Sequence, residues 1–115
     1  MDKVAAYKKI ARSVVESLGR MVKPTFDGIE TEVITDDEKG HYLLFMVGWH
    51  NRQWHYASLL HIDIKSDGKV WLQHDGTDLV IAEELVEKGI PKHDIVLAYK
   101  TPSAREMMTE WGMAA

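Results

Sequence analysis

Residues 59–77 constrain the fold most, because they have the pattern of two β-strands joined by one tight turn. Ser66, Asp67 and Gly68 suit a three-residue loop that closes with a left-handed glycine. A two-residue loop of Asp67 and Gly68 would shift the register by one and mix apolar with polar side chains on both faces. That shift would lose apolar burial worth roughly 25 cal/mol per Å². The sequence therefore predicts a hairpin with the longer loop.

Counting back from this loop sorts the hairpin's side chains onto two faces. The predicted pairs are Lys65 with Lys69, Ile64 with Val70, Ile62 with Leu72 and Leu60 with His74. One face is then almost wholly apolar, and the other carries Leu59, His61, Asp63, Trp71, Gln73 and Asp75. Since strand side chains alternate, His61 and His74 are expected to point to opposite faces.

A second tight turn, at Asn51 and Arg52, extends the hairpin into an antiparallel meander. It predicts pairs of Trp49 with Trp54, Val47 with Tyr56, and Leu43 with Leu60. Leu60 falls on the same apolar face by both counts. The predicted core face consists of Leu43, Val47, Trp54, Leu60, Ile62, Val70 and Leu72.

The opposite face of the meander carries a second apolar patch. Its predicted pairs are Leu44 with Leu59, Met46 with Ala57, Tyr42 with His61, and Gly48 with His55. Monomers seldom leave a large apolar patch bare, so we expect the C-terminal segment to cover this one. The alternative is a docking surface for a partner, and self-association into a homo-oligomer through the same patch fits the sequence equally well.

The remaining segments complete an α+β fold. Apolar positions from Val4 to Leu18 recur at helical spacing, with Gly19 and Pro24 as the stop. The predicted order is an N-terminal helix, four antiparallel strands (29–35, 41–49, 53–64 and 70–75), a helix capped by Thr77 or Asp78 that ends at Gly89, a short extended segment over 95–99, and a terminal helix begun by Thr101 and Pro102. The sequence leaves open whether 95–99 joins the sheet.

Length and composition indicate one domain over residues 1–115. The chain has no cysteine, and no apolar run approaches membrane-spanning length, so we expect a cytoplasmic protein. The net charge is −4. Residues 1–23 carry six basic against two acidic side chains, which leaves the rest of the chain acidic and without a general attraction for nucleic acid.

A metal site is the first chemistry that the polar residues suggest. Imidazoles and carboxylates at His61, Asp63, His74 and Asp75 are typical zinc, iron or manganese ligands. The predicted register separates the two imidazoles and leaves at most two or three ligands. We therefore expect no metal and no cofactor, with these side chains in structural roles.

Catalytic machinery is not evident either. No thiol exists, and Ser58 is expected on the face away from His61 and Asp63, so no nucleophile and base meet. The single glycine of residues 75–77 does not make a phosphate loop. We predict a protein that is not an enzyme, with a small metal-dependent hydrolase using His61 and Asp63 as an alternative.

Two features suit binding. Lys8, Lys9 and Arg12 form the one local cluster suited to DNA phosphate, although Arg12 can pair with Glu16 on a solvated helix face. Direct DNA binding through the N-terminal helix is therefore a further alternative. Trp71, a large aromatic on a polar face, is typical of an interface anchor.

The strings LLHIDIK, GKVWLQHDGT and VEKGIPKHDIVLAY, with the amphipathic first helix, resemble the XisI-like family over the whole chain. That family is known from a cyanobacterial factor that controls excision of a DNA element from a nitrogen-fixation gene. Asp78 replaces the family's usual glutamate, and Ala98-Tyr99 replaces Gly-Phe.

The resemblance implies an accessory, non-catalytic regulator that works with an XisH-like partner. The candidate partner-binding residues are Trp71, Gln73, His61, Asp63, Leu44, Met46 and Leu59.

Overall fold

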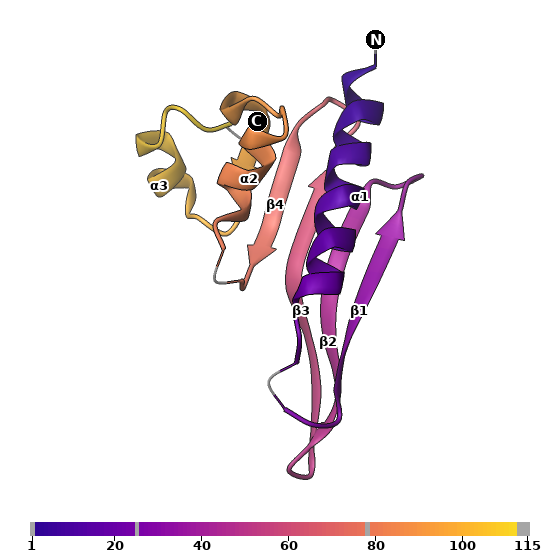
Figure 1. The fold of residues 1–115 in the computed structure, drawn as a ribbon. Helices are drawn as coiled ribbons and strands as arrows, with labels where there is room; N and C mark the ends of the chain where they lie inside the picture. Colours follow the sequence, from indigo (N-terminus) through magenta and orange to yellow (C-terminus); the bar gives the residue numbers. More distant parts are fainter. Residues whose placement is uncertain (1, 25, 78, 113–115) are drawn as a thin grey trace.

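The computed structural model describes residues 2–24, 26–77 and 79–112 and confirms the α+β class. Its elements, in chain order, are α1 (Lys3–Met21), β1 (Ile29–Asp36), β2 (His41–His50), β3 (Gln53–Ile64), β4 (Val70–Asp75), α2 (Ile81–Glu87), the 3-10 turn η1 (Lys92–Asp94), β5 (Ile95–Leu97) and α3 (Pro102–Met107). They form a sheet in the order β1-β2-β3-β4-β5 (Figure 1). The sequence predicted four strands, and the sheet has a fifth, because β5 joins it parallel to β4.

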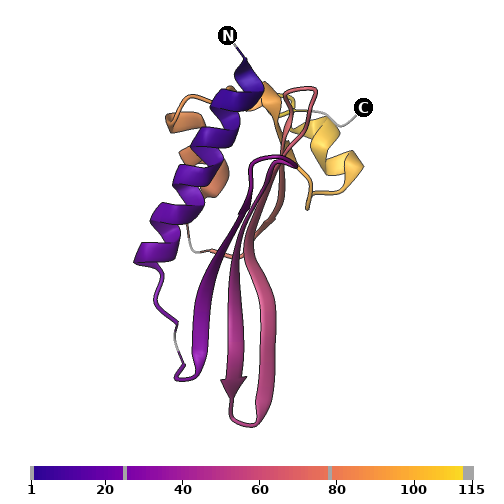
Figure 2. The ribbon, with the colours of Figure 1, turned by 90° about the vertical axis from the view of Figure 1, so that its right-hand side faces the viewer.

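α1 and α2 lie side by side over one face of the sheet (Figures 1 and 2). The Asp2 side chain caps α1 by accepting a hydrogen bond from the Val4 N–H at 3.0 Å. The helix continues through Gly19 to Met21 rather than ending at the glycine. A Cβ at position 19 would come 2.4 Å from Cγ2 of Val33 on β1, so this glycine lets the helix approach the strand closely.

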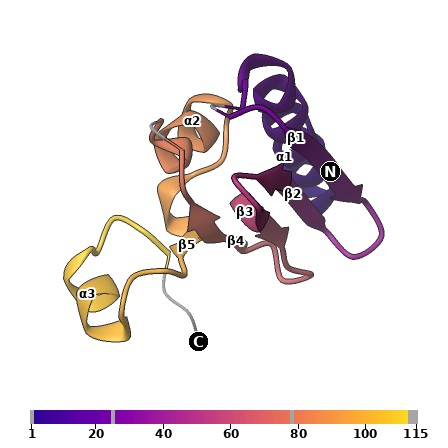
Figure 3. The ribbon, with the colours of Figure 1, turned by 90° about the horizontal axis from the view of Figure 1, so that it is seen from below.

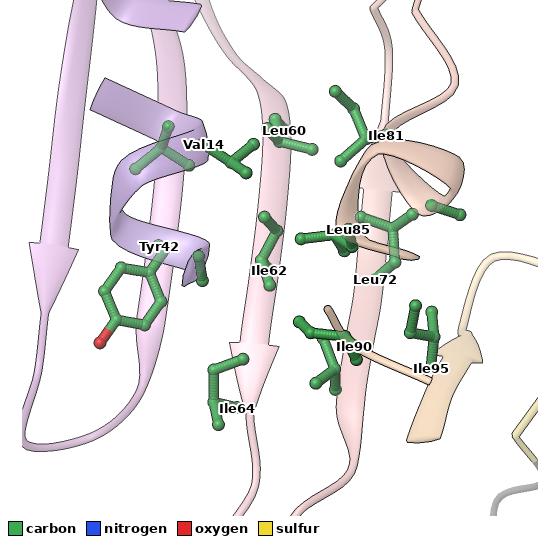
Figure 4. Close-up of a cluster of buried hydrophobic side chains, with 14 of the residues drawn as sticks. Val14, Tyr42, Leu60, Ile62, Ile64, Leu72, Ile81, Leu85, Ile90 and Ile95 are labelled. Atoms are coloured by element: carbon green, nitrogen blue, oxygen red, sulfur yellow. The ribbon is translucent and has the colours of Figure 1, made fainter. Parts of the chain in front are cut away.

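The main core lies between these two helices and the sheet (Figure 4). Leu60, Ile62 and Leu72 from the central strands are fully buried there. The helices and the sheet contribute the other members, which include Val14, Leu18, Tyr42, Leu44, Ile64, Val70, Ile81, Leu85, Ile90 and Ile95.

Both predicted turns are confirmed. Asn51 and Arg52 have φ of 50° and 63°, the left-handed pair that a two-residue hairpin turn requires. The second loop closes with Gly68 at φ 88°, and the Lys65 N–H donates to the Lys69 carbonyl at 2.9 Å.

A β-bulge at Leu59 corrects the predicted register between β2 and β3. Leu44 pairs with Leu60, while Phe45 pairs with Ser58, so Leu59 is an extra residue on β3. The pairs nearer the Asn51 turn are confirmed: Trp49 with Trp54, Val47 with Tyr56, Met46 with Ala57, and Gly48 with His55. The pairs beyond the bulge are wrong: Leu43 with Leu60, Leu44 with Leu59, and Tyr42 with His61.

This bulge changes which residues of β2 and β3 reach the core. Tyr42 and Leu44 are fully buried under α1, whereas Leu43, Val47 and Trp54, which were predicted to be core, face away from it. Trp54 is 52% exposed. The physical reason is that a single inserted residue exchanges the two faces of one strand relative to its neighbour.

A second bulge, at Gln73, corrects the register between β3 and β4. Ile62 pairs with Leu72 as predicted, but His61 pairs with His74 and Leu60 with Asp75. Residues directly opposite one another share a face. The prediction that His61 and His74 point to opposite faces is therefore wrong.

The same bulge turns Asp75 toward α2. Its Oδ2 accepts a hydrogen bond from the Ile81 N–H at 3.2 Å, at the first turn of the helix. The predicted cap by Thr77 is wrong, because the Thr77 hydroxyl donates to Asp75 instead, at 2.6 Å. The other predicted cap, Asp78, lies outside the described residues.

The C-terminal segment does not cover the second sheet face within the described residues. Thr101 caps α3 as predicted, accepting from the Ala104 N–H at 3.1 Å. The segment then lies beside β5, where the Gly112 N–H donates to the Ile95 carbonyl at 2.8 Å. Figure 3 shows α3 at the β5 edge, away from β1 to β3.

A buried carboxylate ties the start of α1 to η1. Asp94 is 4% exposed and accepts hydrogen bonds from the Tyr7 hydroxyl at 2.6 Å and from Lys3 Nζ at 3.4 Å. Burial opposes ionisation of Asp94, but the Tyr7 and Lys3 contacts outweigh it and hold its pKa below the ordinary value. Burial and the same carboxylate raise the pKa of Tyr7 to about 12.

Replacing Leu60 by Ala should lower the free energy of unfolding by about 2–5 kcal/mol, because it opens a cavity between the sheet and the helices. Urea unfolding followed by circular dichroism measures this loss. Leu79→Ala, at a site that is 46% exposed, is the control and should change stability by less than about 0.5 kcal/mol. Equal losses in both variants would contradict the assigned core.

Asp94→Asn should be less stable than the unmodified chain by about 1–3 kcal/mol at pH 7. Because the folded-state pKa of Asp94 is depressed, its stabilisation is present above the ordinary value of 3.8 and disappears as the pH falls through the lower folded-state pKa. The stability gap should therefore close in acid. Urea unfolding from pH 7 to pH 2 tests this, with the exposed Glu30→Gln as control, and a gap that widens in acid would refute it.

Candidate partner-binding surface

The face of β1 to β3 that points away from α1, here called the open face, carries large apolar side chains with no helix over them in the described chain (Figure 2). Trp49 is 62% exposed, Tyr56 66% and Trp54 52%. The apolar members of the open face are Ile34, Leu43, Phe45, Val47, Trp49, Trp54 and Tyr56. Their strands continue past the end of α1 as an arm (Figure 1).

Aromatic pairs run across the two central strands of this face. The rings of Phe45 and Tyr56 lie 5.1 Å apart, and those of Trp49 and Trp54 lie 5.6 Å apart, both tilted. Cross-strand aromatic pairs stabilise a hairpin that helix packing does not support. These rings are therefore held in place while their outer surfaces stay open to contact.

A polar cluster of His41, His61, Asp63, Lys65 and Gln73 lies on the same face, at the end of the strands away from the Asn51 turn. His41 Nδ1 lies 3.2 Å from His61 Nε2 and 3.7 Å from an oxygen of Asp63. The Asp63 carboxylate, only 4% exposed, accepts from Lys65 Nζ at 2.7 Å and from the Gln73 amide at 3.4 Å.

His61 is kept neutral by its surroundings. Burial lowers the pKa of its imidazole below the ordinary 6.5, the neighbouring His41 lowers it further, and Asp63 opposes the shift. The neutral ring of His61 can thus take part in the 3.2 Å hydrogen bond with His41 as donor or acceptor, according to its tautomer.

The predicted metal-ligand set is not brought together. Asp75 points toward α2, while Asp63 is already engaged by Lys65 and Gln73. Within the described residues, no group of three or more His, Cys, Asp or Glu side chains is placed to hold a metal ion. Ser58 shares the open face with His61, contrary to expectation, but its hydroxyl donates to the Leu60 carbonyl at 3.2 Å.

Trp71 lies at the β4 flank of the open face, opposite Asp63. Lys65 Nζ lies 5.6 Å from its ring centre, a cation–π contact that helps to hold the half-buried indole. Trp71, Gln73, His61 and Asp63, four of the predicted contact residues, therefore share one surface.

The other three predicted contact residues lie on the α1 side of the sheet. Leu44 is fully buried in the core. Met46 and Leu59 line a groove beside Leu18 and Val22, at the C-terminal end of α1. The Leu59 bulge explains why these three residues do not share a face with the other four, since the prediction assumed an uninterrupted alternation.

The predicted DNA-contact cluster on α1 is partly engaged by the protein itself. Arg12 pairs with Asp37 at 2.7 Å and with Glu16 at 3.5 Å. Asp37 also accepts from the Tyr42 hydroxyl at 2.7 Å, and these two donors hold its pKa below the ordinary value. Lys9 is exposed and Lys8 half-buried, so two of the three cations remain near the surface.

Sequence reasoning missed His41 and the exposed aromatic row as members of this site. The cross-strand pairs Trp49–Trp54 and Val47–Tyr56 were available from the Asn51 turn alone. The exposure of these side chains could not be predicted from the sequence, because it depends on which face of the sheet α1 covers.

Comparison with known proteins gives a family. The family described as XisI protein matches residues 1–113. The chain belongs to the XisI family.

Two solved structures of XisI proteins share the fold over nearly the whole chain. An XisI-like protein from Anabaena variabilis ATCC 29413 is 35% identical, with a TM-score of 0.88, and the match covers 96% of this chain and 99% of that one. The fdxN element excision controlling factor XisI from the same organism is 28% identical, with a TM-score of 0.85, over 98% and 100% of the two chains. No curated protein sequence matches the chain.

None of the helices in the described part of this XisI-family chain is long and apolar enough to cross a membrane.

An NMR titration of the imidazole resonances should give His61 a pKa below 6.5. His41→Gln should raise that pKa, because it removes a neighbouring imidazole, and Asp63→Asn should lower it, because it removes the opposing negative charge. A pKa of His61 at or above 6.5 would contradict the described cluster.

Proposed function

We propose that this XisI-family protein is a non-catalytic regulator of DNA-element excision that acts by binding an XisH-like protein. The observation that carries the proposal is the indole of Trp71, held by Lys65 beside a polar cluster, on a fold shared, end to end, with an excision controlling factor. A large aromatic side chain among polar groups is typical of an interface anchor.

The polar groups of the open face support binding over catalysis. Catalysis needs a general base with a nucleophile or substrate beside it, whereas the Ser58 hydroxyl donates to the Leu60 carbonyl and Asp63 is bonded to Lys65 and Gln73. Such a satisfied cluster is rigid and half-buried. It suits the polar part of a protein interface, where fixed donors and acceptors set the orientation of the partner.

Trp71 is the proposed anchor for the partner. Indoles are enriched among the residues that dominate binding energy, and this one is held by Lys65 beside the polar groups of Gln73 and Asp63. The proposed contact therefore centres on β4 and the adjoining end of β3.

Co-expression with an XisH-like protein should yield a complex that survives size-exclusion chromatography. Trp71→Ala should weaken it by about 2 kcal/mol or more, roughly 30-fold in dissociation constant, as expected for a central anchor. Calorimetric titration of the purified proteins measures the change. Met21→Ala, at an exposed apolar residue of α1, is the matched control and should bind as the unmodified chain does.

Two results would count against this proposal. The first is a chain that never associates with the XisH-like protein. The second is a complex that Trp71→Ala and Met21→Ala weaken equally, since binding would then lie elsewhere.

A further inference from the structure

We infer that the open face binds a second copy of this chain, so that two sheets pack face to face in a homodimer. This inference does not rest on the proposed function. The proposed partner contact centres on Trp71 of β4, and the two surfaces meet at His61 and Asp63 at the end of β3.

The first argument for a dimer is the apolar area that the open face exposes. The three most exposed rings, Trp49, Trp54 and Tyr56, would bury roughly 150–250 Å² each if fully covered, and they are 52–66% exposed. They alone offer roughly 300–450 Å². With Ile34, which is 43% exposed, and the half-buried side chains between them, the apolar surface reaches on the order of 500–650 Å². A specific interface buries about 800 Å² per partner, so the apolar rows supply most of the area that a dimer needs, and the polar side chains around them supply the rest.

The arrangement of the open face makes it complementary to itself. From the Asn51 turn inward, its rows are Trp49 with Trp54, Val47 with Tyr56, Phe45 with Ser58, Leu43 with His61, and His41 with Asp63. A two-fold axis that crosses the strands at the Phe45 row stacks this row on itself. It also places the row of Val47 and Tyr56 over the row of Leu43 and His61, and the row of Trp49 and Trp54 over the polar row of His41 and Asp63.

At the centre of the interface, this superposition packs apolar side chains of one copy against apolar side chains of the other. Val47 of one copy meets Leu43 of the other, and the two Phe45 rings meet at the axis. The phenol of Tyr56 lies over the neutral imidazole of His61, which offers a hydrogen-bonding partner. Aligned sheets pack about 10 Å apart with interdigitating side chains, which suits rings of this size.

The charges of the open face disfavour a nucleic acid as its occupant. Glu30, Glu32 and Asp36 of the open face sit on β1, the edge strand, and make no ion pair within the described residues. The proposed axis sets Glu32 of one copy over Glu32 of the other, so these side chains must stay at the solvated rim of the dimer, where charges are tolerated. Against DNA or RNA the same carboxylates would repel phosphates beside the aromatic rows.

Site-directed crosslinking tests this arrangement, because the natural chain has no cysteine. Ser58→Cys places a thiol on the open face beside the proposed axis, and Ala57→Cys places one on the opposite face of the same strand. A short bismaleimide spans the roughly 10 Å between packed sheets. Ser58→Cys should give a crosslinked dimer in good yield, and Ala57→Cys should remain a monomer on a denaturing gel.

Sedimentation of the full chain from roughly 1 to 500 µM gives an independent reading. The mass should rise from 13.1 kDa to twice that value. Tyr56→Glu should raise the dimer dissociation constant at least about 30-fold, since it buries an unpaired charge in the centre. Leu79→Glu, at an exposed site on the α2 side, should leave it unchanged, and circular dichroism confirms that both variants fold.

A monomer at every concentration overturns the inference, as does a dimer that crosslinks through Ala57→Cys or ignores Tyr56→Glu. A monomer that still binds an XisH-like protein overturns the homodimer alone. A dimer crosslinked through Ser58→Cys that binds no XisH-like protein overturns the proposed function alone.

Discussion

One inserted residue, Leu59, determines how the two faces of this sheet are used. Its bulge places Leu60 opposite Leu44, so that both side chains are fully buried under α1. Without the extra residue, β3 would keep strict alternation and bring Leu43 to the core instead. The exposed aromatic row follows from this placement. Side chains alternate along a strand, so when Leu44 points toward α1, its neighbours on β2 and every second residue after them must point away from the helices.

The same geometry explains why the protein suits binding. α1 and α2 take one face of the sheet, α3 lies beside β5, and the strands of the arm extend past the helical layer (Figures 1 and 3). The polar cluster is closed on itself, with Asp63 held by Lys65 and Gln73. A rigid polar patch beside exposed rings provides orientation and contact area together, as protein interfaces require.

Local signals in the sequence were sufficient for the elements and both turns. The Ser66–Gly68 loop and the Asn51–Arg52 turn depend on backbone conformations that few residues adopt, so residue type reveals them. The bulges have no such signature, because Leu59 and Gln73 are ordinary strand residues. The predicted β2–β3 pairs are therefore correct up to Met46–Ala57 and wrong beyond Leu59, and the predicted β3–β4 pairs are correct from the Gly68 loop as far as Ile62–Leu72. The joining of β5 also escaped prediction, since a three-residue parallel strand depends on where α2 packs.

The most direct test of this account is a nuclear Overhauser spectrum of the central strands. Cross-strand contacts between Leu44 and Leu60, and between Phe45 and Ser58, are the result expected from the bulge. Contacts between Leu43 and Leu60, together with Leu44 and Leu59, would show uninterrupted alternation. That result would return Leu43 to the core and contradict the assigned open face.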